Sequence, residues 1–154
     1  MTGIVDDAID RLLVRLLIND GRATLRTLSE AAGLSISATQ ARVRRLESEG
    51  IIQGYGASVD PSAIGLPLAA FIAISPLDPA QPDDTPARLA GLSAIESCHS
   101  VAGAYSYILS VRVASPQALE QLIRDIRRIA RVQTQTTVVL QTFFSRPSSP
   151  LPID

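Results

Sequence analysis

A short stretch in the first third of the chain carries side chains suited to reading DNA. Side chains three or four residues apart share one side of a helix, and the four concerned here are Ser37, Gln40, Ala41 and Arg44. Arg and Gln can each make paired hydrogen bonds to base edges, and small side chains let a helix approach the major groove closely. The pattern indicates a DNA-contacting helix, although an ordinary helical bundle with a solvated basic face has the same pattern.

Basic residues gather around this helix even though the whole chain is close to neutral. Residues 22–45 carry five Arg and one Glu, whereas residues 1–21 have a net charge of −2. Arg22 lies just before the preceding helix, where it can hold a phosphate and set the register on the duplex. We predict that the DNA contacts come from Arg22, Ser35, Ser37, Ala38, Gln40, Ala41, Arg44 and Arg45.

Three amphipathic helices are needed to position these residues. Between Asp6 and Asp20 apolar residues recur every three or four positions, and Asp6 is a candidate N-cap. A second helix is predicted after Thr24 and ends at Gly33, and a third begins after Ser35. Two helices joined by a short, glycine-containing turn form the helix-turn-helix arrangement.

The chain is expected to change character after residue 50. Ile51–Val59 is typical of a strand interrupted by glycines, and Asp60–Pro67 of a turn or short helix. We therefore expect a helix-turn-helix domain at residues 1–50, a hinge strand and linker at 51–66, a second domain at 67–146 and a Pro/Ser-rich tail at 147–154.

The second domain is predicted to be ferredoxin-like, in the α+β fold class. Strands are indicated at Leu68–Ser75, Ile95–Ala102, Tyr105–Val113 and Val132–Phe144, and two helices are predicted with Thr85 and Ser115 as their N-caps. A β-α-β-β-α-β order leaves one face of a four-stranded sheet without helices. Because these strands are too apolar to leave that face in water, we expect at least a homodimer.

The composition excludes several other classes of protein. Of the 154 residues, 46% are hydrophobic and 19% charged, so the chain can bury a core. No apolar run approaches the roughly 20 residues of a membrane span. No secretory signal is visible, and we expect a cytoplasmic protein without membrane contact.

A catalytic or metal site is not indicated by the reactive residues. Cys98 and His99 are neighbours in a predicted strand, so they point to opposite faces and cannot act together as nucleophile and base. We expect Cys98 to be a buried thiol. With a single Cys, a single His and no suitable Asp/Glu cluster, we expect no metal, no cofactor and no enzymatic activity.

Several segments together resemble the Lrp/AsnC family, the feast/famine transcription regulators of bacteria and archaea. They are Asp6–Leu13, Asp20–Thr24, Gly33–Ser35, Arg42–Tyr55 and Val101–Leu109. The stretch that begins Arg42-Val-Arg-Arg-Leu-Glu is rather specific. Pro76–Asp84 looks like the corresponding segment of actinobacterial members, mycobacteria among them.

The resemblance implies a winged-type helix-turn-helix at Leu25–Arg44 and a ferredoxin-like sensing domain. Its implied partners are double-stranded DNA, a free amino acid as effector, and further copies of the chain in dimers and octamers. The effector residues that it implies lie in the loop after the second sheet strand and on the last strand: Ser100, Val101, Ala102, Gly103, Ala104, Tyr105, Ser106, Thr134 and Thr136.

The effector loop departs from the family at one position. Family members often have Gly-x-x-Asp, whereas this chain has Gly103-Ala-Tyr-Ser106. A carboxylate can pair with the ammonium group of an amino acid, whereas a serine hydroxyl can only hydrogen-bond it. Either an Asp lies elsewhere in the pocket, or backbone carbonyls suffice, or the response to effector is weakened or lost.

These observations favour a sequence-specific, DNA-binding transcription regulator modulated by an amino acid through linked equilibria. Two alternatives stay open. One is a nucleoid-organising DNA-binding protein with low sequence specificity, and the other is an amino-acid-sensing assembly protein that binds a protein partner.

Overall fold

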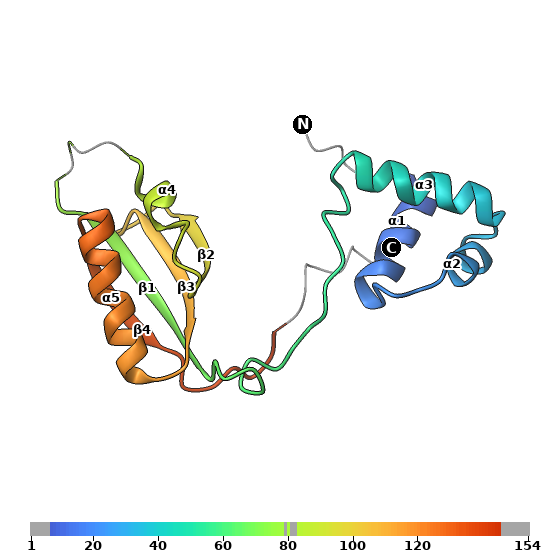
Figure 1. Ribbon diagram of the computed structural model, residues 1–154. Coiled ribbons are helices and arrows are strands. Elements are labelled where there is room, and N and C mark those ends of the chain that lie inside the picture. Colours follow the sequence, from blue (N-terminus) through green and yellow to red (C-terminus); the bar gives the residue numbers. More distant parts are fainter. Residues whose placement is uncertain (1–6, 79, 81–82, 146–154) are drawn as a thin grey trace. The chain divides into compact units, whose positions relative to one another are not determined.

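The computed structural model describes residues 7–78, 80 and 83–145. The chain forms two compact units, the first ending at Ser58 and the second spanning Val59–Phe143. The first unit contains α1 (Ala8–Asn19), α2 (Leu25–Ala32) and α3 (Ile36–Ser48), as Figure 1 shows. These three helices confirm the helices predicted from the apolar periodicity.

Side-chain caps explain where the three helices begin. Asp7 accepts hydrogen bonds from the backbone N–H groups of Ile9 and Asp10, and Thr24 and Ser35 cap α2 and α3 in the same manner. The predicted cap Asp6 lies outside the described residues. Gly33 ends α2 in the left-handed conformation, with φ of 64°, as glycine readily does. The core of this unit is formed by Leu13, Leu28, Val43 and Leu46.

The prediction of a strand at Ile51–Val59 is wrong for this chain, since these residues pair with no other segment among those that the structure describes. A strand needs a neighbour for its backbone groups. Instead, the N–H groups of Ile51 and Ile52 both donate to the Leu46 carbonyl, and their side chains pack on the helical core. The following residues turn as predicted, with the Leu66 N–H donating to the Pro61 carbonyl.

The second unit contains a four-stranded antiparallel sheet and two helices. Its elements in chain order are β1 (Leu68–Pro76), α4 (Thr85–Leu89), β2 (Ile95–Ser100), β3 (Tyr107–Val113), α5 (Pro116–Ala130) and β4 (Val132–Val138). The strand order β2-β3-β1-β4 confirms the ferredoxin-like α+β arrangement.

Several predicted element ends differ from those observed. β2 ends at Ser100 and β3 begins at Tyr107, so a longer loop joins them, and β4 ends at Val138, where it pairs with Ala70 of β1. The extent of backbone pairing decides where a strand ends, and periodicity alone does not show it. The N-cap of α4 is Asp84 and not Thr85.

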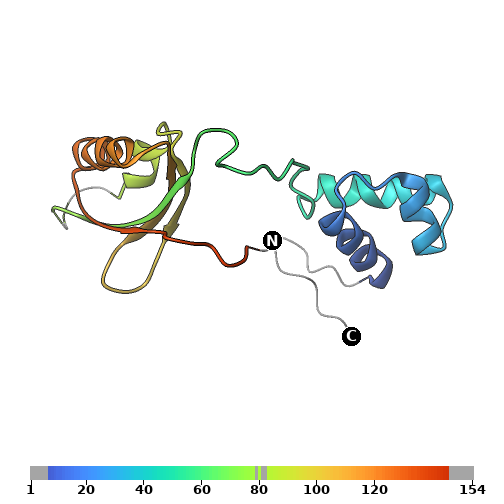
Figure 2. The ribbon, with the colours of Figure 1, turned by 90° about the horizontal axis from the view of Figure 1, so that it is seen from below.

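The two faces of the sheet differ in what covers them. α4 and α5 lie on the same face (Figure 2), over a core that includes Ile72, Leu109 and Ile126. The other face is open in the single chain, and the side chain of Phe71 on it is 49% exposed. Alternation along β3 is complete, with Tyr107, Leu109, Val111 and Val113 buried.

Cys98 is exposed, which corrects the prediction of a buried thiol. The reason is that β2 is an edge strand. The register pairs Cys98 with Leu109 and His99 with Ile108, so the two side chains do point to opposite faces. Partial desolvation raises the pKa of the Cys98 thiol.

Candidate functional site

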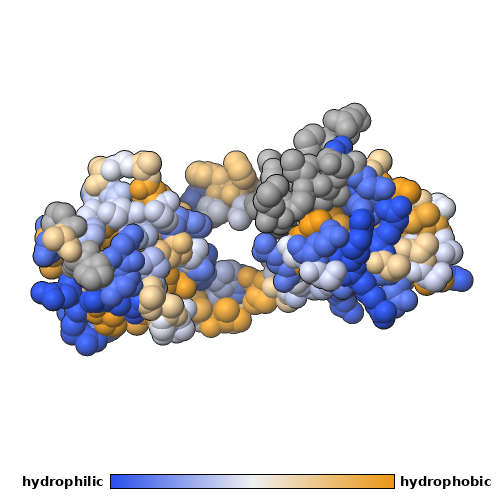
Figure 3. Space-filling view, turned by 90° about the horizontal axis from the view of Figure 1, so that it is seen from above, coloured by the Kyte–Doolittle hydropathy of each residue, from blue (hydrophilic) through white to orange (hydrophobic). Residues whose placement is uncertain are grey.

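The outer side of α3 presents the predicted DNA-reading residues. Ser37, Ala41 and Arg44 are exposed and Gln40 is half-buried, whereas Thr39, Val43 and Leu46 on the inner side are buried. Figure 3 shows hydrophilic residues gathered on the side of this unit that α3 occupies at the top of Figure 1. One helix therefore separates a packing face from a polar face that is exposed among the described residues of this unit.

Two predicted DNA-binding arginines have guanidinium groups available for a ligand. Arg44 and Arg22 are exposed, and within the described part of the chain neither guanidinium takes part in an ion pair or hydrogen bond. Arg26, by contrast, lies 3.9 Å from Glu30. An unpaired guanidinium can bind a base edge or a phosphate without first losing an ion pair.

Ser35 and Ala38 lie at the first turn of α3. The Ser35 hydroxyl accepts a hydrogen bond from the Ala38 N–H at 3.2 Å and lies 3.2 Å from the Ser37 hydroxyl. Ser35 therefore stabilises the start of α3. The Ser35 hydroxyl can still make a further hydrogen bond, and both it and the Ala38 methyl are exposed at the N-terminal end of α3.

Arg45 has a partner that the sequence analysis missed. Its guanidinium contacts the carboxylate of Asp10, whose side chain is only 4% exposed. The other oxygen of Asp10 accepts from Arg42 at 2.8 Å, and Arg42 also lies 3.1 Å from Asp7. These two carboxylates hold the pKa of the Arg42 guanidinium above its ordinary value, chiefly through the hydrogen bond with Asp10.

The buried Asp10 therefore joins α1 to α3 by two charged contacts. The signal for this role was available in the sequence, because Asp10 shares the helix face of Leu13 and Leu17, where an apolar residue is expected. Since the side chain of Arg45 is 50% exposed, part of it remains accessible.

The end of α3 also holds the first residues of the linker. The Tyr55 hydroxyl donates to a carboxylate oxygen of Glu47 at 2.8 Å. Partial burial, together with this carboxylate, raises the pKa of Tyr55 to about 12. With the two N–H groups that donate to Leu46, this hydrogen bond attaches residues 51–55 directly to α3.

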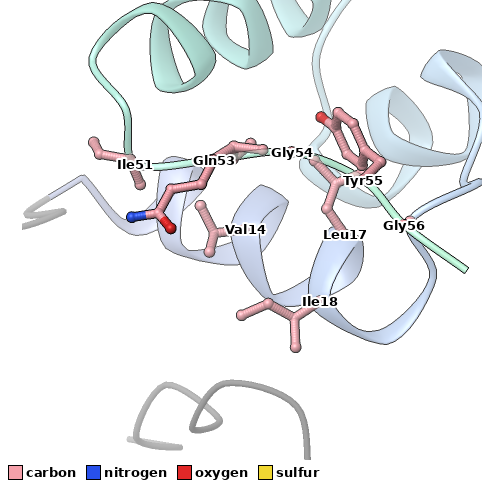
Figure 4. Close-up of a pocket in the computed structure, with 10 residues that line it drawn as sticks. Val14, Leu17, Ile18, Ile51, Gln53, Gly54, Tyr55 and Gly56 are labelled. Atoms are coloured by element: carbon pink, nitrogen blue, oxygen red, sulfur yellow. The ribbon is translucent and has the colours of Figure 1, made fainter. Parts of the chain in front are cut away.

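A hollow of about 550 Å³ lies between this segment and α1. Figure 4 shows Val14 and Leu17 of α1 pointing toward the segment Ile51–Gly56, which carries Gln53 and Tyr55. None of the predicted DNA-binding or effector residues lines it.

The predicted effector loop lines a second hollow, of about 570 Å³, in the other unit. The Val101 N–H donates to the Ser106 carbonyl and the Ser106 N–H donates to the Ile74 carbonyl, which closes the loop and ties it to β1. All seven predicted loop residues from Ser100 to Ser106 line this hollow, together with Pro76, Asp83 and Tyr107. Its volume is within the usual range of small-ligand sites, roughly 300–1,000 Å³.

Asp83 places a carboxylate at this hollow, which sequence analysis did not identify. The hydroxyl of the buried Tyr107 donates to Asp83 Oδ1. This hydrogen bond, more than desolvation, raises the pKa of Tyr107 to about 12. Asp83 follows a proline-rich loop, and the sequence offers no spacing that would link it to Tyr107, 24 residues later.

Thr134 and Thr136 do not line the hollow. They pair with Ile74 and Ile72 of β1, on the face of the sheet that the helices cover. The Thr134 hydroxyl accepts from Arg127 Nε at 2.7 Å. Within one chain the predicted effector residues therefore form two groups. The loop residues line the hollow, whereas the two threonines lie on β4, under the helices.

Neither a metal site nor a membrane span is found among the described residues. No group of three or more His, Cys, Asp or Glu side chains there is arranged to hold a metal ion. Across the same residues, the helices lack the combination of length and apolarity needed to cross a membrane.

A helix-turn-helix unit followed by an α+β unit with a ligand-sized hollow defines the class of helix-turn-helix transcription regulators. Two family models match the chain in this order, "Winged helix-turn-helix DNA-binding" at residues 6–53 and "Lrp/AsnC ligand binding domain" at residues 69–149. The chain belongs to the Lrp/AsnC family.

Individual relatives agree with this assignment over most of their length. The HTH-type transcriptional regulator LrpA of Mycobacterium tuberculosis is 60% identical over 139 residues, which are 90% of this chain and 93% of that protein. The solved structure of a feast or famine regulatory protein from M. tuberculosis, complexed with L-methionine, has 57% identity and a TM-score of 0.91, covering 94% of this chain and 99% of the other. A transcriptional regulator from Neisseria meningitidis, also solved with L-Met, has 28% identity and a TM-score of 0.82, covering 95% and 96%.

Proposed function

We propose that the protein is a sequence-specific, DNA-binding transcription regulator whose DNA affinity or assembly is modulated by an amino acid. The observation that carries the proposal is the outer face of α3, where the exposed guanidinium of Arg44 projects beside small side chains. A polar helix face free of packing contacts fits the major groove, which admits one α-helix.

The proposed contacts divide into reading and positioning groups. Arg44 and Gln40 would hydrogen-bond base edges, while Ser37 and Ala41 allow close approach to the groove floor. Arg22, outside the recognition helix, would contact a phosphate and contribute equally on all sequences.

We propose that the open face of the sheet is covered by a second copy of the chain. The half-exposed Phe71 on that face favours this, since a sheet face with large apolar side chains is stabilised by burial. Two copies related by a two-fold axis would read a two-fold DNA site. Further assembly into octamers is proposed from the family resemblance.

The amino-acid effector is proposed to bind at the hollow formed by the loop Ser100–Ser106. Its size supports this, as do the relatives solved with L-methionine. An amino acid that binds one assembly state more tightly than another shifts the population toward that state and so changes DNA binding.

A selection of genomic DNA fragments tests the proposal. The full chain is incubated with fragments at ~150 mM salt, which suppresses non-specific phosphate attraction, with and without a pool of the twenty amino acids. A shared two-fold motif whose recovery changes with amino acids is the expected result, and Arg44→Ala is the matched variant that should lose the motif. Equal recovery of all fragments would favour a nucleoid-organising role, and recovery of none a role in binding a protein partner.

A further inference from the structure

We propose that Asp83, positioned by Tyr107, binds the ammonium group of the amino-acid effector. The hollow would thereby select amino acids over the corresponding hydroxy acids. This inference rests on the proposed effector function and assigns to that hollow a residue outside the loop.

The hollow carries a negatively charged side chain. Ten residues line it, and Asp83 is the one among them with a carboxylate. In the described part of the chain no cationic side chain pairs with Asp83, whereas its neighbour Asp84 lies 2.9 Å from Arg88. The Asp83 carboxylate is therefore an anionic group at a ligand-sized hollow without a counter-ion, and a ligand cation would supply one.

A hydrogen bond from Tyr107 orients the Asp83 carboxylate. Tyr107 is buried and donates its hydroxyl hydrogen to Oδ1 of Asp83. Because Tyr107 is fixed within the core next to β1 and β2, the hydrogen bond holds the exposed carboxylate in one place. Oδ2 is left as an acceptor for a ligand N–H.

The loop offers hydrogen-bond donors for the carboxylate group of an amino acid. The backbone N–H groups of residues 102–105 donate to no other group in the described chain, although the loop on either side of them is hydrogen-bonded. Unpaired backbone N–H groups are suitable donors to a carboxylate. At Gly103 an added Cβ would meet no atom within 4 Å, so the loop is open at this position.

These groups together match the head group of a zwitterion. A carboxylate acceptor, Asp83, and unpaired N–H donors in the loop line the same hollow. The loop has Ser106 where the family often has Asp, and Asp83 provides the missing negative charge from the segment before α4. A hydroxy acid presents a neutral hydroxyl to Asp83 and would lose the charge-assisted hydrogen bond.

Binding of two probes to the full chain tests the assignment. Isothermal titration calorimetry measures the dissociation constants of L-methionine and of its 2-hydroxy analogue for the wild type, Asp83→Asn and Asp84→Asn. We expect Asp83→Asn to weaken L-methionine binding by about 10- to 100-fold and to leave the hydroxy analogue nearly unchanged, as loss of a hydrogen bond between charged groups predicts. The control Asp84→Asn should change neither constant.

Tyr107→Phe examines the positioning role. It should reduce the preference for L-methionine over the hydroxy analogue, a ratio that a general loss of folding does not change. Asp83→Ser, with circular dichroism to verify folding, is a second variant should Asp83→Asn fold poorly.

The outcomes separate this inference from the proposed function. If the wild type and Asp83→Asn show the same preference for L-methionine over its hydroxy analogue, the role of Asp83 is overturned and the effector site stays in place. A wild type that binds none of the twenty amino acids would overturn the effector function itself. If another amino acid binds in place of L-methionine, that amino acid and its own 2-hydroxy analogue are the pair compared, and the same ratio decides.

Discussion

Replacing Asp10 by Asn should destabilise the helix-turn-helix unit, because Asp10 is a buried carboxylate with two arginine partners. Asn keeps the volume of the side chain and removes its charge. Arg42 and Arg45 would then face each other across a neutral amide. The connection between α1 and α3 would lose the two charged contacts to Asp10 and keep the one between Arg42 and Asp7, at 3.1 Å.

The size of the effect follows from burial. Breaking a fully buried ion pair costs about 3–5 kcal/mol, whereas an exposed pair contributes about 0–1 kcal/mol. The Asp10 side chain is 4% exposed, but those of Arg42 and Arg45 are 31% and 50% exposed and can be partly solvated after the change. We therefore expect Asp10→Asn to lower the free energy of unfolding by about 2–3 kcal/mol, which for a small domain is a fall in Tm on the order of 10 °C.

Hydrogen exchange measured by mass spectrometry on the full chain is the appropriate assay, because it reports the two units separately. Peptides from α1 and α3 should exchange faster in Asp10→Asn, and peptides from the sheet should be unchanged. Glu120→Gln is the matched control, since Glu120 accepts from Arg124 at 2.6 Å on the exposed side of α5. It should leave α1 and α3 unchanged.

A measured loss below about 0.5 kcal/mol would refute the reasoning. It would mean that the cost of burying the Asp10 carboxylate cancels its two ion pairs, as occurs in some proteins.

Three further predictions concern other parts of the chain. Arg44→Ala should remove the preference for a selected DNA fragment over random duplex, whereas Arg22→Ala should weaken binding to both alike and reduce the slope of log affinity against log salt concentration by about 1. Fluorescence anisotropy at several salt concentrations measures both effects. Equal losses of affinity for the selected and the random duplex in Arg44→Ala would contradict its reading role. Because the folded-state pKa of Tyr55 and Tyr107 is raised to about 12, their stabilising contribution is complete below pH 10 and is lost as the pH rises through 12. Phenolate absorbance should show two tyrosines that ionise near pH 12, and each Tyr→Phe change should remove one of them. Ionisation of both near pH 10 would count against both hydrogen bonds. Ser115→Ala removes the N-cap of α5 and should lower the free energy of unfolding by about 1 kcal/mol in urea denaturation, with recovery in Ser115→Asp.

The elements that could be predicted from the sequence are those specified by local chemistry. Ser35 and Ser115 cap α3 and α5 at the helix starts predicted from the sequence, and buried and half-buried side chains alternate along β3, as expected of a strand with one face on the core. A cap and a period of apolar residues act within one or two turns or strands, so a single sequence contains the whole signal.

The errors concern contacts between distant segments. The length of β4 depends on how far its backbone pairs with β1, and Ile51–Val59 forms no strand because no segment among the described residues pairs with it. Cys98 was expected to be buried, as free cysteines usually are, but the strand order places β2 at the edge of the sheet. Strand order is a property of the whole sheet, which periodicity cannot supply.

The candidate sites follow the same division. Ser37, Ala41 and Arg44 share the outer side of α3 because helical spacing alone determines this, and their DNA contacts stay a prediction. Asp83 and Tyr107 are 24 residues apart and meet only through the fold, so a search for the carboxylate at the loop itself could not find Asp83.

The attachment of the linker to α3 has a mechanical consequence. The backbone bonds from Ile51 and Ile52 to Leu46 and the hydrogen bond from Tyr55 to Glu47 all end on α3, the helix proposed to enter the groove. Tension or torsion carried by the linker therefore acts on α3 through hydrogen bonds, and on α1 and α2 only through the apolar packing of Ile51 and Ile52. The Tyr55 bond is exposed to solvent, so we expect a pull on the linker to break it before the backbone bonds. Once it breaks, the remaining load falls on the last turn of α3, and fraying of that turn would alter the angle at which Arg44 is presented for its proposed DNA contact.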